Sequence, residues 1–171
     1  MIAPTRKAHA FSGCWSNSKA IGISHRDDGA GLVIKLTDEM KTAVNNALAD
    51  KTPCVVATAS SDGKPGIGLR GSVMAYGNDS LAYWERTFRQ GSENIESNPH
   101  IAILYRNSAT RQSWKFFGQA EVHRDDDVRE DVMSKTIQAE LDRDTERNGV
   151  AVVVRLDRVE TMGGEVLMSV N

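Results

Sequence analysis

The chain has 171 residues, of which 40% are hydrophobic and 26% are charged, and its formal net charge is −2. This length is typical of one domain, and the composition is that of a soluble globular protein, not a disordered one. The lack of a basic excess argues against a nucleic-acid partner. No apolar run approaches the roughly 18 residues that a membrane span needs. We therefore expect one globular domain that binds neither nucleic acid nor membrane.

The two cysteines, Cys14 and Cys54, are too few for a disulfide framework. Cys54 lies in an apolar run, which predicts a small buried side chain. Residues 1–35 show no sustained periodicity and lack the apolar core of a signal peptide. We expect an N-terminal extension over residues 1–35, a folded domain over residues 36–171, and a cytoplasmic location.

The first predicted element is a helix that begins after Thr37, a favourable N-cap. Its apolar residues recur at helical spacing and form one stripe: Met40, Ala43, Val44, Ala47 and Leu48. Further helices are predicted over residues 91–97 and, after the cap at Asp125–Asp127, over a segment whose buried side would hold Val128, Val132, Met133, Ile137 and Leu141.

Strands are predicted over residues 54–60, 66–76, 81–85, 101–106, 113–123, 150–156 and 165–170, with the sixth extending toward Met162. In the second strand, Ile67, Leu69, Gly71, Val73 and Ala75 would share one face. Asp62-Gly63 and Gly163-Gly164 mark turns. Six or seven strands with hairpin links and three helices indicate an antiparallel α+β barrel, not a doubly wound sheet.

Three familiar kinds of site receive little support. Gly66-Ile-Gly68-Leu-Arg-Gly71 spells a dinucleotide fingerprint, but no helix can begin after it to receive a pyrophosphate. The histidines and cysteines have no metal-ligand spacing, so we expect no metal. Glu121 and His123 share a strand face and could form an acid–base pair, although a solvated strand edge explains them better.

Residues 70–99 hold the most informative pattern. This segment supplies guanidinium groups, hydroxyls, an aromatic ring and the start of a predicted helix. Its candidate cofactor-binding residues are Arg70, Gly71, Ser72, Trp84, Arg86, Thr87, Arg89 and Gln90. Arginine binds phosphate through two parallel hydrogen bonds, and a helix N-terminus favours an anion. The pattern suits a planar, phosphorylated ligand; the alternative is a surface hairpin with solvated arginines and a buried tryptophan.

Residues 37–123 resemble the pyridoxamine 5'-phosphate oxidase-like family of FMN-binding split β-barrels. The resemblance rests on several segments in order: Pro53-Cys-Val-Val-Ala, Gly68-Leu-Arg70-Gly-Ser72, Leu81-Ala-Tyr-Trp84, Asn94-Ile95-Glu-Ser-Asn98-Pro99 and Trp114-Lys-Phe-Phe-Gly118-Gln-Ala120. The C-terminus, Glu165 to Asn171, lacks the W-x-x-x-R-L segment of the vitamin B6 oxidases. The chain is therefore similar to the broad family and not to that oxidase.

The resemblance implies a split β-barrel homodimer that holds FMN at the subunit interface. Arg70 would correspond to the phosphate-binding arginine, and Trp84 would lie beside the flavin. The family's lysine is Gly91 here, so Arg86 or Arg89 would replace the lost charge. Trp114 and Phe116 share a strand face that is a candidate for closing the flavin groove from the partner subunit; the alternative is that they fill the barrel of their own subunit.

The resulting hypothesis is an FMN-dependent oxidoreductase that acts on a small molecule, with no identifiable catalytic side chain. The alternatives are a non-catalytic flavin-binding or haem-binding protein and a deazaflavin-dependent protein on the same fold. Because Arg70 lies in mid-strand, we expect it to contribute more phosphate affinity than Arg89, which must be ordered on binding.

Overall fold

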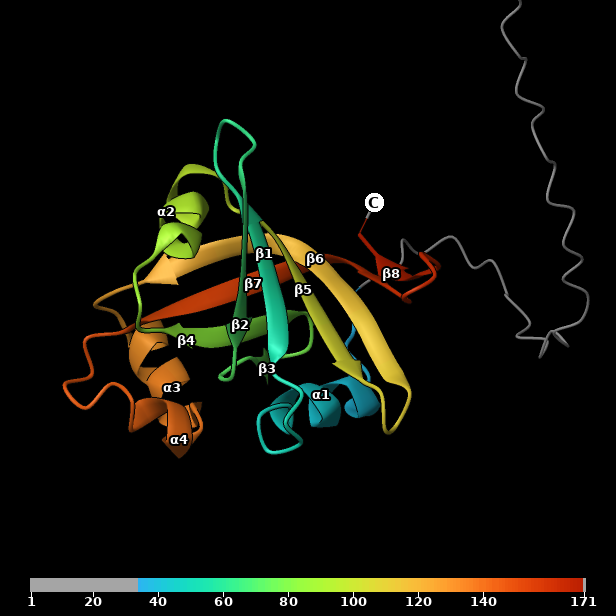
Figure 1. Cartoon of the computed structure of the whole chain (residues 1–171), viewed down its shortest axis with the longest axis horizontal. Coiled ribbons are helices and arrows are strands. Elements are labelled where there is room, and N and C mark those ends of the chain that lie inside the picture. Colours follow the sequence, from blue (N-terminus) through green and yellow to red (C-terminus); the bar gives the residue numbers. More distant parts are fainter. Residues whose placement is uncertain (1–33, 171) are drawn as a thin grey trace, which may run out of the picture.

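The computed structural model describes residues 34–170, so the predicted extension at residues 1–35 lies almost entirely outside the described residues (Figure 1). The elements, in chain order, are α1 (Asp38–Asn45), β1 (Cys54–Ala59), β2 (Pro65–Arg70), β3 (Met74–Tyr76), β4 (Ser80–Glu85), α2 (Gln90–Ser97), β5 (His100–Asn107), β6 (Gln112–His123), α3 (Asp127–Lys135), α4 (Gln138–Leu141), β7 (Val150–Glu160) and β8 (Val166–Ser169). No helix within residues 34–170 is long and apolar enough to cross a membrane.

All strands pair antiparallel in one sheet of order β2-β1-β5-β6-β7-β4-β3, and β8 pairs with β7. The first and last strands of this order, β2 and β3, are separated in sequence only by residues 71–73. The sheet must therefore curl until its two edges meet, as Figure 1 shows where the end of β2 reaches β3. The predicted antiparallel α+β split barrel is confirmed.

The predicted strand over residues 66–76 is wrong in its middle, where the chain leaves β2 and enters β3 at the opposite edge. We call residues 71–73 the split. Here the Ser72 hydroxyl accepts the Trp84 amide hydrogen at 3.1 Å and donates to the Trp84 carbonyl at 3.2 Å. The side chain thereby replaces backbone pairing with β4. The expected common face is lost: Ile67 is 80% exposed, whereas Val73 is buried.

The core lies inside the barrel and includes the two aromatic residues expected at a partner surface. Phe116 is fully buried, and Trp114 is buried in a stack on Tyr105 with 5.7 Å between ring centroids. Both belong to the main cluster of their own subunit. The expectation that they close the groove of a partner subunit is therefore wrong, and the alternative, that they fill the barrel of their own subunit, is confirmed. Cys54 is buried as predicted, and burial raises the pKa of its thiol to about 12.

The helices begin where their caps predict. The Thr37 hydroxyl accepts the Met40 amide at 3.2 Å, and Asp126 accepts the Arg129 amide at 2.8 Å. The long second-half helix predicted to end near Leu141 is instead divided into α3 and α4. Thr136 adopts extended backbone angles while its hydroxyl donates to the Val132 carbonyl, and this ends α3.

We expect Gly118→Ala to lower the free energy of unfolding by about 3 kcal/mol, the upper part of the range for overpacking. The register of β6 and β7 shifts after Phe117, and a Cβ at Gly118 would collide with the Arg155 carbonyl. Urea unfolding measures the change. Gly163→Ala is the matched control, because the nearest atom to its Cβ would be 3.7 Å away. Equal stability of the two variants would contradict the assigned collision.

Candidate functional site

Two cavities meet beside the split and share Leu69, Arg70 and Thr87. The first, the α2 cavity, has a volume of about 370 Å³ and is lined by Val56, Thr58, Gly66, Ile67, Gly68, Leu69, Arg70, Tyr83, Thr87, Arg89, Gln90 and Gly91. The second, the α4 cavity, has a volume of about 230 Å³ and is lined by Leu48, Pro53, Leu69, Arg70, Gly71, Trp84, Glu85, Arg86, Thr87, Glu140 and Arg143.

One wall of the α2 cavity is the face of β2 that carries Gly66, Gly68 and Arg70. A Cβ at Gly66 would lie 2.9 Å from both Asn94 Nδ2 and Thr58 Oγ1. A Cβ at Gly68 would lie 2.8 Å from Arg70 Nη1. A side chain at either position would therefore displace the end of the Asn94 or the Arg70 side chain from β2.

The N-terminus of α2 forms the opposite wall. Arg89 occupies the N-cap position without a capping side-chain hydrogen bond, and the first amides of a helix have no partner within the helix. A Cβ at Gly91 would lie 3.5 Å from Arg70 Nη2. This distance is an ordinary van der Waals contact, so the Arg70 guanidinium lies against the first turn of α2.

Arg70 is bound within the chain by Glu85, which is only 2% exposed. Arg70 Nε and Nη2 donate to the same oxygen, Glu85 Oε2, at 2.9 and 2.5 Å. The second oxygen, Oε1, accepts the Thr87 amide at 2.9 Å and the Thr87 hydroxyl at 2.7 Å. This buried ion pair joins the end of β2 to the end of β4 across the split.

Tyr83 lies beside this pair, with its ring centroid 5.9 Å from Arg70 Cζ. Burial raises the pKa of Tyr83 above its ordinary value, and the negative charge of Glu85 raises it further. The phenol therefore stays neutral at physiological pH. It can contribute a polar ring face to the cavity but cannot supply a phenolate base.

The α4 cavity has its own buried carboxylate, Glu140. Arg86 Nε lies 3.5 Å and Arg143 Nη1 lies 3.2 Å from its two oxygens. A Cβ at Gly71 would lie 2.5 Å from Glu140 Oε1, so a larger residue there would displace the carboxylate from the split. Both arginines are thus partly neutralised by one glutamate.

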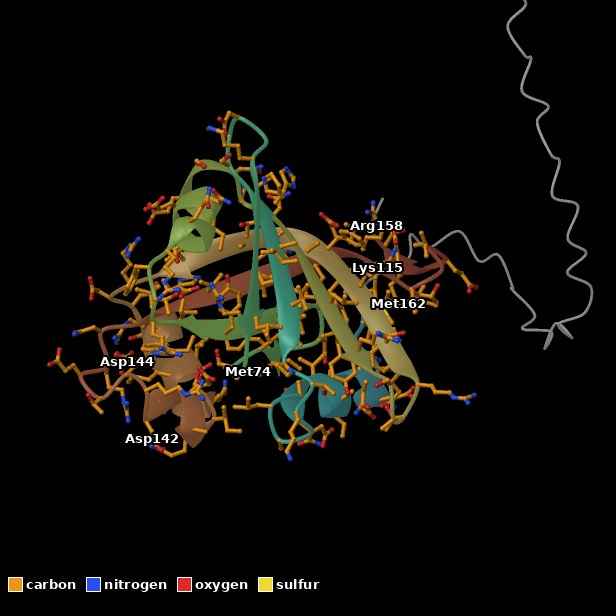
Figure 2. All side chains as sticks on the ribbon, viewed as in Figure 1. Met74, Lys115, Asp142, Asp144, Arg158 and Met162 are labelled. Carbon is orange, nitrogen blue, oxygen red and sulfur yellow. The ribbon has the colours of Figure 1, made fainter. Side chains whose placement is uncertain are left out.

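Trp84 is 2% exposed and forms part of the wall of the α4 cavity. Its indole nitrogen donates to Asp144 Oδ2 at 2.8 Å, and the Arg129 guanidinium lies 4.9 Å from its ring. Figure 2 shows Asp144 beside the end of β4. Burial acts to raise the pKa of Asp144, but hydrogen bonds from the indole and from the Gly149 and Asn148 amides hold it below its ordinary value. These contacts fix Trp84 in place and leave little of its ring free to stack on a ligand.

The structure brings most of the predicted site residues together. Arg70 and Thr87 line both cavities; Gly71, Trp84 and Arg86 line the α4 cavity; and Arg89 and Gln90 line the α2 cavity. Ser72 lines a neighbouring cavity beyond the split, and Trp114, buried in the core, lines neither the α2 nor the α4 cavity.

Sequence reasoning missed the residues that control charge and close approach: Gly66, Gly68, Glu85, Glu140 and Arg143. Glu85 left one signal in the sequence, because it ends the apolar run Leu81-Ala-Tyr-Trp84 of a predicted strand. A carboxylate in such a place requires a cationic partner. Gly66 and Gly68 were noticed only as part of a fingerprint that does not apply.

We expect Arg70→Ala to lower the free energy of unfolding by about 3–5 kcal/mol, because it leaves the Glu85 carboxylate buried without its cation. Arg89→Ala is the control: Arg89 is exposed and has no ion pair within residues 34–170, so its loss should change stability by less than about 0.5 kcal/mol. Chemical denaturation measures both. Equal effects would show that the Arg70–Glu85 pair does not hold the split together.

Comparison with solved structures finds the same fold. A proposed pyridoxamine 5'-phosphate oxidase from Lactobacillus delbrueckii is 28% identical, with a TM-score of 0.60 over 75% of this chain and 96% of that one. A single-residue variant of HupZ from Group A Streptococcus is 25% identical, with a TM-score of 0.59 over 74% of this chain and 98% of that one.

A pyridoxamine 5'-phosphate oxidase-related, FMN-binding protein from Nostoc punctiforme is 15% identical, with a TM-score of 0.50 over 67% of this chain and 76% of that one, and shows a likeness of fold alone. No match was found among curated proteins. The family model described as pyridoxamine 5'-phosphate oxidase matches residues 36–163. The chain therefore belongs to the pyridoxamine 5'-phosphate oxidase family.

Proposed function

We propose that this protein binds FMN in the α2 cavity and acts as a flavin-dependent oxidoreductase on a small molecule. The observation that carries the proposal is the position of Arg89 at the N-terminus of α2, in a cavity whose other wall is the glycine-containing strand β2. A cation beside unpartnered helix amides is a suitable site for a phosphate.

The residues present fit a flavin phosphate better than they fit haem. The α2 cavity falls within the volume range of small-molecule sites and combines apolar and polar walls. Among the described residues, the linings of both cavities contain no histidine, cysteine or methionine. Those are the usual axial ligands of haem iron, and Tyr83, the one phenol in the α2 cavity lining, is held neutral.

Bound FMN would supply hydride or electron transfer at its ring. This chain's own residues would hold the phosphate with Arg89 and the amides of Gln90 and Gly91, while β2 would provide one wall. The lining of the α2 cavity contains no carboxylate, imidazole or thiol. The residues of the cavity would therefore bind and orient rather than transfer protons, which suits direct transfer between substrate and ring.

The same lack of an acid or base suits a second candidate, a flavin-binding or deazaflavin-binding protein without catalytic turnover. Absorption spectra and mass spectrometry of the ligand released by heat identify the cofactor. Reduction of the bound flavin by NADH or NADPH, followed by turnover of an acceptor, distinguishes the enzyme from the binding protein.

We also propose a homodimer, formed through a different surface from the one that the sequence suggested. Ile67 and Leu69 are 80% and 64% exposed on β2, an edge strand, and both line the α2 cavity. Exposed apolar side chains on a sheet edge favour pairing, and two-fold symmetry is the commonest solution. A second copy against this strand would also cover the cavity.

For the cofactor, we expect the purified protein to bind FMN with micromolar or tighter affinity and Arg89→Ala to weaken that binding by about tenfold. One charge-assisted hydrogen bond contributes roughly this much. Riboflavin, which lacks the phosphate, should bind the two proteins equally well. Isothermal titration measures both ligands. The proposal fails if no flavin binds, and the role of Arg89 fails if riboflavin loses as much affinity as FMN.

For the dimer, we expect light scattering to report twice the chain's 18.7 kDa. Ile67→Glu combined with Leu69→Glu should produce a monomer, because the interface would then bury two unpaired charges from each copy. Val166→Glu is the control, since Val166 is 47% exposed on β8. A wild-type mass of one chain at all concentrations would refute the dimer, and monomers from the control alone would place the interface elsewhere.

A further inference from the structure

Arg70 already binds an anion of its own chain, the Glu85 carboxylate. All three guanidinium nitrogens have partners in this chain: Nε and Nη2 donate to Glu85, and Nη1 donates to the Leu69 carbonyl at 3.0 Å. The side most suited to a phosphate, the fork of two parallel donors, is therefore occupied by a carboxylate.

The Glu85 carboxylate is firmly held. Its second oxygen accepts both donors of Thr87, and the residue is 2% exposed. To leave Arg70, the carboxylate would have to break two hydrogen bonds to the guanidinium while Thr87 holds its other oxygen, and it would have to find new partners in a buried position. Separating a buried charge from its partner is strongly unfavourable, because the charge is then left without compensation. Glu85 is thus a fixed negative charge at the boundary of the two cavities.

The net positive charge around the α2 cavity is therefore smaller than its two arginines suggest. Arg70 and Glu85 cancel, and Arg89 has no ion pair within the described residues. A phosphate that approached Arg70 would also approach Glu85 Oε2, which lies 2.5 Å from Arg70 Nη2. Repulsion between these anions opposes the attraction of the guanidinium.

We propose that Glu85 is a specificity-determining residue that weakens the binding of phosphorylated ligands by occupying Arg70. The inference rests on the proposed flavin site. It assigns the phosphate to Arg89 and the α2 N-terminus, and it makes the preference for FMN over riboflavin modest. With its carboxylate charge removed, position 85 would allow Arg70 to join Arg89 as a second phosphate ligand.

The wild-type protein gives the first test, because it needs no substitution. FMN should bind about tenfold more tightly than riboflavin, the contribution of one charge-assisted contact. A preference of several hundredfold or more would overturn the inference, since it would mean that Arg70 binds the phosphate in spite of Glu85.

Glu85→Gln provides the second test, because it removes the charge and keeps hydrogen-bonding groups of similar shape. We expect it to tighten FMN binding by about tenfold or more and to leave riboflavin within about twofold. Glu85→Asp, which keeps the charge, is the matched control and should give no such gain. Melting curves confirm that each variant is folded; if Glu85→Gln is not, the wild-type ratio decides the question.

A double-variant cycle identifies the group that gains the phosphate. In the Glu85→Gln background, Arg89→Ala should reduce FMN affinity by a smaller factor than in the wild type, because Arg70 then also binds the phosphate. Unchanged FMN affinity in a folded Glu85→Gln protein overturns the inference and leaves the flavin proposal standing. Failure of both flavins to bind any variant overturns the flavin proposal, and the inference with it.

Discussion

The ion pair between Arg70 and Glu85 is the interaction on which the rest of the structure depends. The sheet has two free edges, β2 and β3, which the chain connects through only three residues. No strand pairing joins β2 to β4 there, so the pair and the Ser72 hydroxyl bridge the split with side chains. Because Glu85 is buried, its charge makes this closure dependent on one guanidinium.

The same pair decides the electrostatics of the site. A barrel closed by a salt bridge places an arginine and a carboxylate between two cavities, so the arginine cannot be counted as a free anion ligand. Glu140 does the same to Arg86 and Arg143 on the other side. Among the described residues, the site is rich in arginine but far less positive than its arginine content suggests. Arg89, at the N-terminus of α2, is its clearest uncompensated cation.

The glycines of β2 allow close packing against that strand, although their spacing matches a dinucleotide-binding fingerprint. Gly66 and Gly68 do not bind a dinucleotide through a helix; they let α2 and the Arg70 side chain approach β2 closely. The residues that alternate with them, Ile67 and Leu69, are exposed on this edge strand. One alternating strand thus contributes both small and exposed apolar residues to the α2 cavity lining.

Local sequence was sufficient to determine the helix caps at Thr37 and Asp126, the position of most strands and the antiparallel class, because these follow from short-range periodicity and capping. It also brought Arg70, Thr87 and Arg89 into one candidate site. The break at residues 71–73, the burial of Trp114 and the pairing of Arg70 with Glu85 could not be read in this way. Each depends on which strands meet when the sheet curls, and those contacts join residues far apart in the chain. Alternation alone cannot tell a continuous strand from one that crosses between two edges, nor whether an arginine is free or already paired.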